Sequence, residues 1–181
     1  MRSKVHSYSI IAFSSAIIAV LAQITIPLPL IPITGQSLAI GLIATILPIK
    51  LSITAVTLYI LIGALGIPIY ANFSGGLGIL FGPTGGFLFS FIVTAFFISY
   101  YLTKSSFTML HCFIANIVGM FINLTLGSIW LKYYLNIDFK SAFMSGFVAF
   151  LLVGIIKAFL ASLAGLQIRN RLQKAKLLAF K

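Results

Sequence analysis

Long apolar runs alternate with short segments rich in Pro, Gly or basic residues along the whole chain. A helix that crosses a bilayer needs about 20 mainly apolar residues, and every run except the second approaches that length. The runs predict six membrane-spanning helices, at about residues 8–26, 36–49, 51–67, 87–102, 109–131 and 142–166. The predicted fold class is an all-α integral membrane protein, with residues 1–181 forming a single transmembrane domain.

Two connections between the predicted helices carry no charge at all. Residues 27–35 are rich in Pro, and residues 71–86 are rich in Gly. Irregular, uncharged backbone is tolerated at the membrane where it folds over protein or lines a cavity. We therefore expect both connections to form a lid or the wall of a pocket.

Composition supports lipid as the solvent for this chain. Hydrophobic residues make up 61% of it and charged residues only 7%, whereas soluble domains are about a quarter charged. Asp138 is the only acidic residue, and the formal net charge is +11. The basic residues flank apolar runs, which indicates topology and lipid headgroup contact rather than nucleic-acid binding. The basic and then apolar N-terminus is interpreted as an uncleaved first span.

The distribution of Lys and Arg predicts the orientation in the membrane. With the N-terminus inside, nine of the twelve basic residues fall in cytoplasmic segments: Arg2, Lys4, Lys50, Lys104, Arg169, Arg171, Lys174, Lys176 and Lys181. Only Lys132 and Lys140 fall outside. We expect both termini in the cytoplasm, a basic cytoplasmic tail at 169–181, and the connections 27–35 and 71–86 on the outer face.

The sequence offers few residues that could carry out catalysis. A single loop carboxylate cannot supply both an acid and a base. The possible metal ligands are only His6, His111, Cys112 and Asp138, so no metal site and no cofactor are predicted. Cys112 is interpreted as a small buried core residue. The chain has no GxxxxGK[ST] loop for ATP, so energy must come from a partner or a gradient.

Lys157 is the one basic residue inside a predicted span, where a charge costs at least about 2.5–3.5 kcal/mol. The alternative is that it snorkels to the cytoplasmic face. Arg169 lies twelve residues further on, roughly 18 Å of helix rise, which exceeds the reach of a lysine. We predict that Lys157 faces an internal cavity and receives an anionic or strongly polar ligand.

Two helix faces carry mostly small or amide side chains. The face around Lys157 has Gly146, Phe150, Gly154, Ala161 and Ala164, and the fifth span has Asn116, Gly119, Asn123 and Gly127. Such faces permit close helix approach. An amide there either bonds a neighbouring helix or contacts a ligand.

Thr34, before Gly35 and Gln36, and Thr84, before Gly85 and Gly86, precede the second and fourth predicted spans. Threonine is a good helix N-cap, and free N–H groups at helix starts can hold a carboxylate or an amide oxygen. The simpler interpretation is that both are only caps. Asn72 and Phe73 add a polar and an aromatic side chain to the Gly-rich connection.

In the first span, Ala12, Ala16, Ala19 and Gln23 share one face. The small residues Ala12 and Ala16 suit tight packing inside the protein or against a partner.

Three segments resemble the BioY family: Ile31-Pro-Ile-Thr-Gly-Gln36, Leu61-Ile-Gly-Ala-Leu-Gly-Ile-Pro68, and Gly75-Gly76 followed by Phe81-Gly-Pro-Thr-Gly-Gly-Phe87. BioY proteins are the biotin-binding substrate-specificity components (S-components) of energy-coupling factor (ECF) transporters. The resemblance implies a six-helix S-component in a bacterial plasma membrane that captures biotin from outside, beneath the first and third loops. It also implies that Ala12 and Ala16 pack against a transmembrane coupling subunit driven by two ATPases.

The resemblance extends to the last helix. The family carries an acidic residue three positions before a lysine; here the lysine is Lys157 and the acidic position is Gly154. The ligand-contacting residues expected from this resemblance and from the chemistry above are Lys157, Asn72, Thr34, Gln36, Phe73, Gly82, Thr84, Gly85, Gly86, Asn116 and Gly154. The alternatives are an S-component for another vitamin, a small membrane enzyme or assembly factor, and a carrier that works without ATPases.

Overall fold

The computed structural model describes residues 4–175. The helices and strands, in chain order, are α1 (Lys4–Ala22), β1 (Thr25–Ile26), β2 (Ile33–Thr34), α2 (Gln36–Ile46), α3 (Ile49–Ala64), the 3-10 turn η1 (Ala71–Phe73), α4 (Leu77–Leu80), α5 (Gly85–Lys104), α6 (Met109–Leu135), α7 (Phe139–Phe143), the π-helical turn η2 (Met144–Val148) and α8 (Ala149–Lys174). Arg2, Lys176 and Lys181 of the predicted cytoplasmic set, and the end of the predicted tail 169–181, lie outside the described residues.

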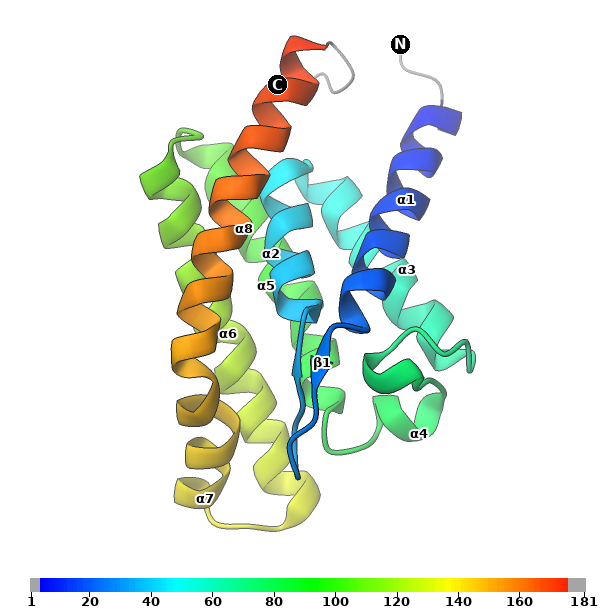
Figure 1. The fold of residues 1–181 in the computed structure, drawn as a ribbon, viewed down its shortest axis with the longest axis vertical. Coiled ribbons are helices and arrows are strands. Elements are labelled where there is room, and N and C mark those ends of the chain that lie inside the picture. The colour runs from blue at the N-terminus through cyan, green and yellow to red at the C-terminus, as the bar shows by residue number, and fades with distance from the viewer. Residues whose placement is uncertain (1–3, 176–181) are drawn as a thin grey trace.

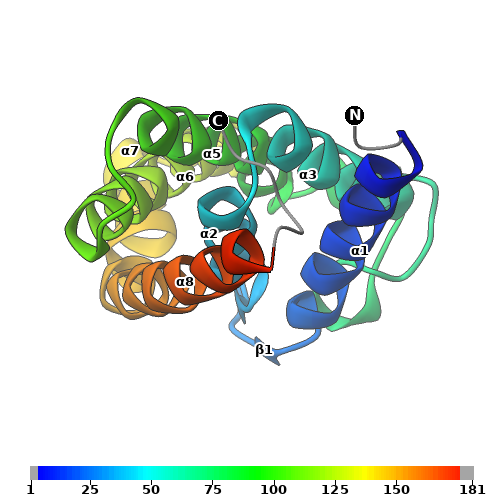
Figure 2. The same ribbon diagram turned by 90° about the horizontal axis from the view of Figure 1, so that it is seen from above.

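The helices form a bundle around α2. Seen from above, α2 lies among α1, α3, α5 and α8 (Figure 2), and it contacts all four as well as α6. Both ends of the described chain lie at the same end of the bundle, which we name the terminal end (Figure 1). The β1–β2 hairpin, α4 and α7 lie at the opposite end, named the hairpin end.

Four helical segments in the described chain are long and apolar enough to cross a membrane: Lys4–Ala22, Gly85–Lys104, Met109–Leu135 and Phe139–Lys174. The helices α2 and α3 are also apolar but shorter. With 11 residues, α2 rises only roughly 16 Å, about half of a bilayer core. The β-hairpin extends this crossing toward the hairpin end (Figure 1).

The helix bounds differ from the predicted spans mainly beside Pro and Gly. The first predicted span continued to Ile26, but α1 ends at Ala22 and residues 25–26 pair with 33–34 as an antiparallel hairpin. Proline disfavours helical backbone in the residue before it, so Ile26 is extended ahead of Pro27. The third predicted span ended at Ile67, whereas α3 ends at Ala64, close to Gly66, whose φ is +97°.

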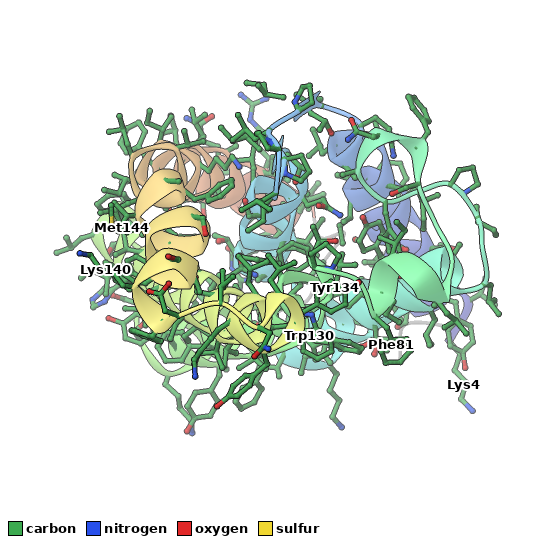
Figure 3. All side chains as sticks on the ribbon, turned by 90° about the horizontal axis from the view of Figure 1, so that it is seen from below. Lys4, Phe81, Trp130, Tyr134, Lys140 and Met144 are labelled. Atoms are coloured by element: carbon green, nitrogen blue, oxygen red, sulfur yellow. The ribbon has the colours of Figure 1, made fainter. Side chains whose placement is uncertain are left out.

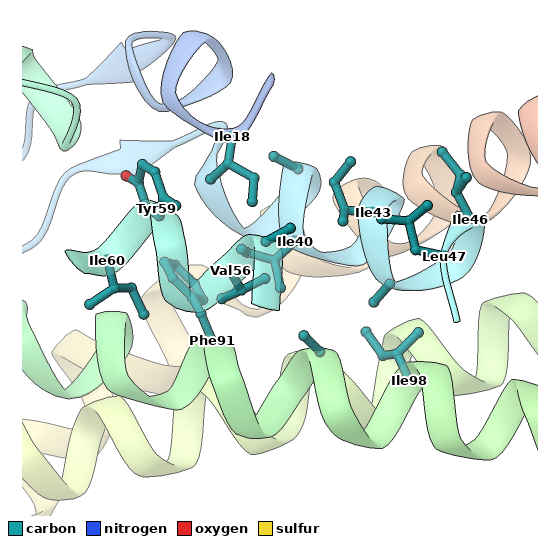
Figure 4. Close-up of a cluster of buried hydrophobic side chains, with 14 of the residues drawn as sticks. Ile18, Ile40, Ile43, Ile46, Leu47, Val56, Tyr59, Ile60, Phe91 and Ile98 are labelled. Atoms are coloured by element: carbon teal, nitrogen blue, oxygen red, sulfur yellow. The ribbon is translucent and has the colours of Figure 1, made fainter. Parts of the chain in front are cut away.

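The larger core cluster lies where α2 meets α1, α3 and α5 (Figure 4). Its members in the close-up include Ile18 of α1, Ile40 and Ile43 of α2, Val56 of α3 and Ile98 of α5, each at most 2% exposed. Lipid is as apolar as these side chains, so close packing rather than removal from water favours their association. Cys112 of α6 is fully buried in the same cluster, which confirms its predicted core role.

At the hairpin end, aromatic side chains join α5, α6 and the 65–84 connection to one another. Figure 3 labels two of them, Trp130 and Phe81. The Trp130 indole N–H donates to the Gly82 carbonyl at 2.9 Å, and the Trp130 ring lies 5.7 Å from that of Phe89. Phe89 in turn lies 6.1 Å from Phe81. These contacts hold the Gly-rich segment against the ends of two helices.

Arg169 holds the terminal end together. Its side chain is only 4% exposed, its Nη1 donates to the Ile46 carbonyl at 2.8 Å, and its guanidinium lies 3.4 Å from the centroid of the Phe107 ring. The first residue of the predicted basic tail is therefore a buried part of α8, and it ties α8 to the C-terminal end of α2.

Candidate ligand-binding cavity

A cavity of about 340 Å³ lies between α2, α5, α6 and α8, and residues of the hairpin and of the 65–84 connection line it toward the hairpin end. Its volume lies in the range of small-ligand pockets, about 300–1,000 Å³. The lining is mainly apolar, and its polar members are Thr34, Gln36, Ser37, Asn72, Ser74, Thr84, Thr94, Asn116, Asn123 and Lys157, with the Tyr70 residue beside them. No carboxylate belongs to the lining contributed by residues 4–175.

Lys157 provides the cationic group of this lining. Its Nζ donates to the Thr34 carbonyl at 2.7 Å and lies 3.3 Å from Ser37 Oγ. The ammonium carries three N–H donors, and these two contacts use two of them. The structure agrees with the prediction that Lys157 faces an internal cavity. The snorkelling alternative is wrong, because Lys157 reaches the N-terminal end of α2 while Arg169 reaches the opposite end at Ile46.

A chain of hydrogen bonds fixes three walls of the cavity to one another. The Thr34 hydroxyl donates to Gln36 Oε1 at 2.9 Å, and Gln36 Nε2 donates to the Tyr59 hydroxyl at 2.6 Å. That hydroxyl donates to the Ile69 carbonyl at 3.2 Å. The hairpin, α2, α3 and the 65–84 connection are thus joined through buried polar groups, which are costly to leave unpaired.

The predicted threonine caps are only partly present. Gly35, not Thr34, occupies the N-cap of α2, so the Thr34 cap prediction is wrong. Thr34 Oγ1 instead accepts a weak bond from the Gln36 N–H at 3.3 Å. Thr84 does occupy the N-cap of α5, but its side chain makes no capping bond. Both threonines line the cavity.

The two buried asparagines of α6 bond other groups with their amide nitrogens. Asn116 Nδ2 donates to Thr45 Oγ1 of α2 and to the Cys112 carbonyl, both at 2.9 Å. Asn123 Nδ2 donates to the Phe87 carbonyl at 3.1 Å and to Ser90 Oγ at 2.6 Å, both on α5. Each residue therefore bonds a neighbouring helix and also lines the cavity, and contact with a ligand stays a prediction.

The amide oxygens of these asparagines are available as acceptors. Neither Oδ1 accepts a hydrogen bond from the residues that the structure describes. The donors of both amides are already committed to helix contacts. The α6 wall can therefore accept hydrogen bonds from a ligand, whereas Lys157 on the α8 wall can donate them.

Gly154 lies one helical turn before Lys157 and also lines the cavity. A Cβ at this position would lie 2.4 Å from Met120 Sδ. The thioether of α6 thus occupies the space into which a side chain at residue 154 would project.

Four of the predicted ligand-contacting residues are not in the cavity lining: Phe73, Gly82, Gly85 and Gly86. Phe73 is 72% exposed. The glycines allow close packing at the start of α5, since a Cβ on Gly86 would lie 2.1 Å from Trp130 Cβ and one on Gly85 would lie 2.0 Å from the Leu80 carbonyl oxygen. The structure thus gives this Gly block a packing role beside the cavity.

Other lining residues were not predicted as ligand contacts. Ser37, Thr94, Asn123, Met120 and the aromatic residues Phe87, Phe91 and Phe150 belong to this group. The sequence carried a signal for Asn123, which lies seven residues, about two turns, after Asn116 on the same face. Phe150 shares the predicted helix face of Lys157. The sequence carried no signal for Phe87 and Phe91, which resemble any lipid-facing or core aromatic residue.

The predicted docking residues lie on the outside of the bundle. Ala12 and Ala16 of α1 are both exposed, while Ile11, Ser14 and Ser15 between and beside them are buried. The small-residue face of α1 is therefore turned away from the protein's own core, toward lipid or a partner.

Long apolar helices around a mainly apolar cavity with a few polar lining groups define a multi-pass membrane protein with a small-molecule site. The chain belongs to the BioY family, whose model matches residues 1–174. This confirms the resemblance inferred from the three segments. Family membership makes the chain a transport protein rather than an enzyme.

Relatives of known identity cover nearly the whole chain. It is 42% identical over 164 residues to the biotin transporter BioY2 of Lactococcus lactis, covering 91% of this chain and 90% of that one. It is 38% identical to the biotin transporter BioY of Thermotoga maritima, covering 86% and 91%. The crystal structure of an S-component for biotin from an ECF-type ABC transporter superimposes with a TM-score of 0.85 at 26% identity, covering 92% of each chain.

Proposed function

We propose that this protein is the substrate-specificity subunit of an ECF transporter and that its cavity binds biotin. The chain crosses the bacterial plasma membrane six times, with both termini in the cytoplasm, and captures biotin from outside. A transmembrane coupling subunit and two ATPases then drive uptake. The observation that carries the assignment is the Lys157 ammonium in a cavity lining that has no carboxylate, in a chain whose relatives are named biotin transporters.

The chemistry of the lining suits the three parts of biotin. Lys157 has an N–H donor left for the carboxylate or the ureido oxygen. The Oδ1 atoms of Asn116 and Asn123 are acceptors for the ureido N–H groups. Phe87 and Phe91 of α5 supply an apolar wall for the thioether ring, and pockets of this kind combine such walls with a few placed polar groups.

The partner surface in this proposal is the face of α1 that carries Ala12 and Ala16. Both residues are exposed, and small residues let another helix approach closely in a membrane. The coupling subunit would pack there. Its ATPase partners supply the energy for which this sequence has no nucleotide loop.

Equilibrium binding of biotin to the purified chain tests the proposal, with biotin methyl ester as competitor. We expect saturable binding of biotin and weaker binding of the ester. Lys157→Met keeps the length and removes the charge, and it is expected to lower biotin affinity about ten- to a hundredfold, the value of a charge-assisted hydrogen bond. Lys140→Met, at an exposed position outside the cavity, is the matched control and should bind like the parent.

Two results would contradict the proposal. Folded parent protein that binds no biotin, but does bind another vitamin in a competition panel, would make the chain an S-component of different specificity. Biotin uptake by cells that contain this chain without coupling subunit or ATPases would instead show a carrier that works alone.

A further inference from the structure

Gln23 follows the last residue of α1 and joins that helix to the wall of the cavity. Its Nε2 lies 3.2 Å from the Ile69 carbonyl oxygen and 3.1 Å from that of Tyr70, and 3.0 Å from the Ala19 carbonyl oxygen within α1. Its Oε1 accepts the Phe73 backbone N–H at 2.9 Å. One side-chain amide thus contacts three residues of the segment 69–73, namely Ile69, Tyr70 and Phe73.

The bound segment is part of the cavity wall. Tyr70, Asn72 and Ser74 all line the cavity. Asn72 and Phe73 have φ values of +57° and +52°, a left-handed conformation that costs energy for residues other than Gly. A strained turn persists where surrounding contacts hold it, and the acceptor at Gln23 Oε1 holds the turn at the Phe73 N–H.

In the part of the chain that the structure describes, the other hydrogen bonds of the segment 69–73 are to residues within or next to it and to α3. The Tyr70 N–H donates to the Ser74 carbonyl at 2.9 Å, and the Tyr70 hydroxyl donates to the Ile60 carbonyl at 2.5 Å. Within residues 4–175, the side-chain hydrogen bonds that join α1 or its end to the segment 69–73 are those of Gln23. Loss of this amide would leave the strained turn tied to α3 alone.

The end of α1 also holds the second wall of the cavity. The Gly35 N–H donates to the Ile24 carbonyl at 2.8 Å, beside the Thr34 carbonyl that receives Lys157. Gln23 directly follows α1, the helix whose exposed residues Ala12 and Ala16 form the proposed docking surface for the coupling subunit. A shift of α1 would therefore act on both walls that close the cavity.

We propose that Gln23 is a positioning residue that holds the segment 69–73 closed over the ligand and links opening of the cavity to movement of α1. The Gln23 latch, meaning its bonds to Ile69, Tyr70 and Phe73, sets how long the ligand stays bound. This inference rests on the proposed function for the identity of the ligand, but the hold on the segment does not depend on that identity.

Two measurements on the full chain test the latch. Amide hydrogen exchange of a peptide covering 69–76, without ligand, reports local opening directly. Stopped-flow exchange of bound biotin for excess competitor reports dissociation. In Gln23→Leu, which keeps the bulk and removes the amide, both rates should rise about tenfold or more, because several hydrogen bonds of this part-buried amide are lost together. The association rate should change less than the dissociation rate.

Two variants complete the design. Gln23→Glu keeps the length and the acceptor for the Phe73 N–H but puts an oxygen where Nε2 donates to carbonyl oxygens, so its exchange and dissociation rates should also exceed those of the parent. Gln173→Leu replaces an exposed glutamine near the opposite end of the bundle and should match the parent. Thermal unfolding separates the latch from general damage, since Gln23→Leu should unfold close to the parent temperature.

The outcomes are distinguishable from those that test the function. Unchanged exchange of 69–76 in Gln23→Leu would overturn the latch, and so would faster exchange with an unchanged biotin dissociation rate. If the parent binds no biotin but Gln23→Leu still speeds exchange in the segment, the hold on the wall stands and only the identity of the ligand fails.

Discussion

A single ammonium group governs the electrostatics of the cavity, and its nearest protein contacts are uncharged. The Thr34 carbonyl and the Ser37 hydroxyl offset part of the cost of burying Lys157. That cost is at least about 2.5–3.5 kcal/mol at the centre of a membrane helix. An anionic group of the ligand would supply the negative charge that these neutral groups lack. The space around the ammonium is therefore a sensitive determinant of affinity.

Gly154 and Met120 control that space together. A Cβ at residue 154 would lie 2.4 Å from Met120 Sδ, so Met120 must move in Gly154→Ala. Methionine has several rotatable bonds, and the room available to it is the cavity that it already lines. We expect Gly154→Ala to fold normally and to bind biotin about three- to tenfold more weakly, a loss of about 1 kcal/mol. Adding Met120→Ala should recover most of the affinity, as measured in a double-mutant cycle of equilibrium binding. Additive losses in the double variant would refute the shared space.

Gly86 tests the packing role of the Gly-rich block. A Cβ there would lie 2.1 Å from Trp130 Cβ, an atom that no rotation about χ1 can move away. We expect Gly86→Ala to destabilise the fold by about 1–3 kcal/mol and to lower Tm by about 2–12 °C. Gly78→Ala is the control, because nothing lies within 4 Å of a Cβ at that position. Thermal unfolding followed by Trp130, the only tryptophan, measures both variants, and equal Tm values would contradict this packing role.

At the scale of elements, the start of α7 depends on the only carboxylate in the chain. Asp138 is the N-cap of α7 and accepts the Ser141 N–H at 3.0 Å and the Ser141 hydroxyl at 2.6 Å. These hydrogen bonds hold the pKa of Asp138 below its ordinary value. A carboxyl whose folded pKa is lowered contributes stability that is fully present above the unfolded value of about 3.9. That contribution is lost as pH falls through the folded value.

The pH dependence of stability follows from this cap. Between pH 5 and about 2, we expect Tm to fall partly through protonation of Asp138. Asp138→Asn keeps an N-cap acceptor and should remove this component while leaving Tm at pH 7 nearly unchanged. Asp138→Ala should lower Tm at pH 7 by a small amount. Since the chain has no other Asp or Glu, an unaltered acid profile in Asp138→Asn would contradict the assignment.

The helical elements were predictable because lipid imposes a simple rule on sequence. A helix satisfies its own backbone, so an apolar run of sufficient length predicts a helix, and each predicted span overlaps a helix of the structure. The ends were less predictable. The β-hairpin depends on pairing between Thr25 and Thr34, and no local pattern in residues 27–35 predicts that strand pairing.

The cavity was predictable only where a residue is chemically out of place in a membrane. Lys157 and Asn116 are polar residues in apolar runs, and both line the cavity. Contacts between distant segments were not predictable. The bond from Gln36 to Tyr59 and that from Gln23 to the segment 69–73 need the folded geometry. The Gly-rich block resembled a ligand-binding loop in sequence, whereas its tight glycines serve contacts such as that of Gly86 with Trp130.

At the scale of the whole molecule, the two ends of the bundle differ in charge and in structure. The terminal end holds most of the basic residues that the structure describes: Lys4, Lys50, Lys104, Arg169, Arg171 and Lys174. The hairpin end holds Lys132 and Lys140, with Asp138 beside them. The hairpin and the 65–84 connection line the cavity on the hairpin side. The positive-inside rule predicts that the terminal end lies in the cytoplasm, and the proposed ligand entry would then face outside, where an uptake system meets its substrate.

Single cysteines at the two ends test this orientation. The only native cysteine, Cys112, is fully buried and should give no background with a membrane-impermeant maleimide. Lys140 of α7 and Lys104, the last residue of α5, are exposed and lie at the hairpin end and the terminal end, respectively. In intact cells, we expect Lys140→Cys to be labelled and Lys104→Cys to be labelled only after the membrane is permeabilised. The reverse pattern would invert the orientation and place the hairpin side of the cavity in the cytoplasm. Labelling of both positions in intact cells would mean that the two ends do not lie on opposite sides, and the proposal of six crossings would fail with it.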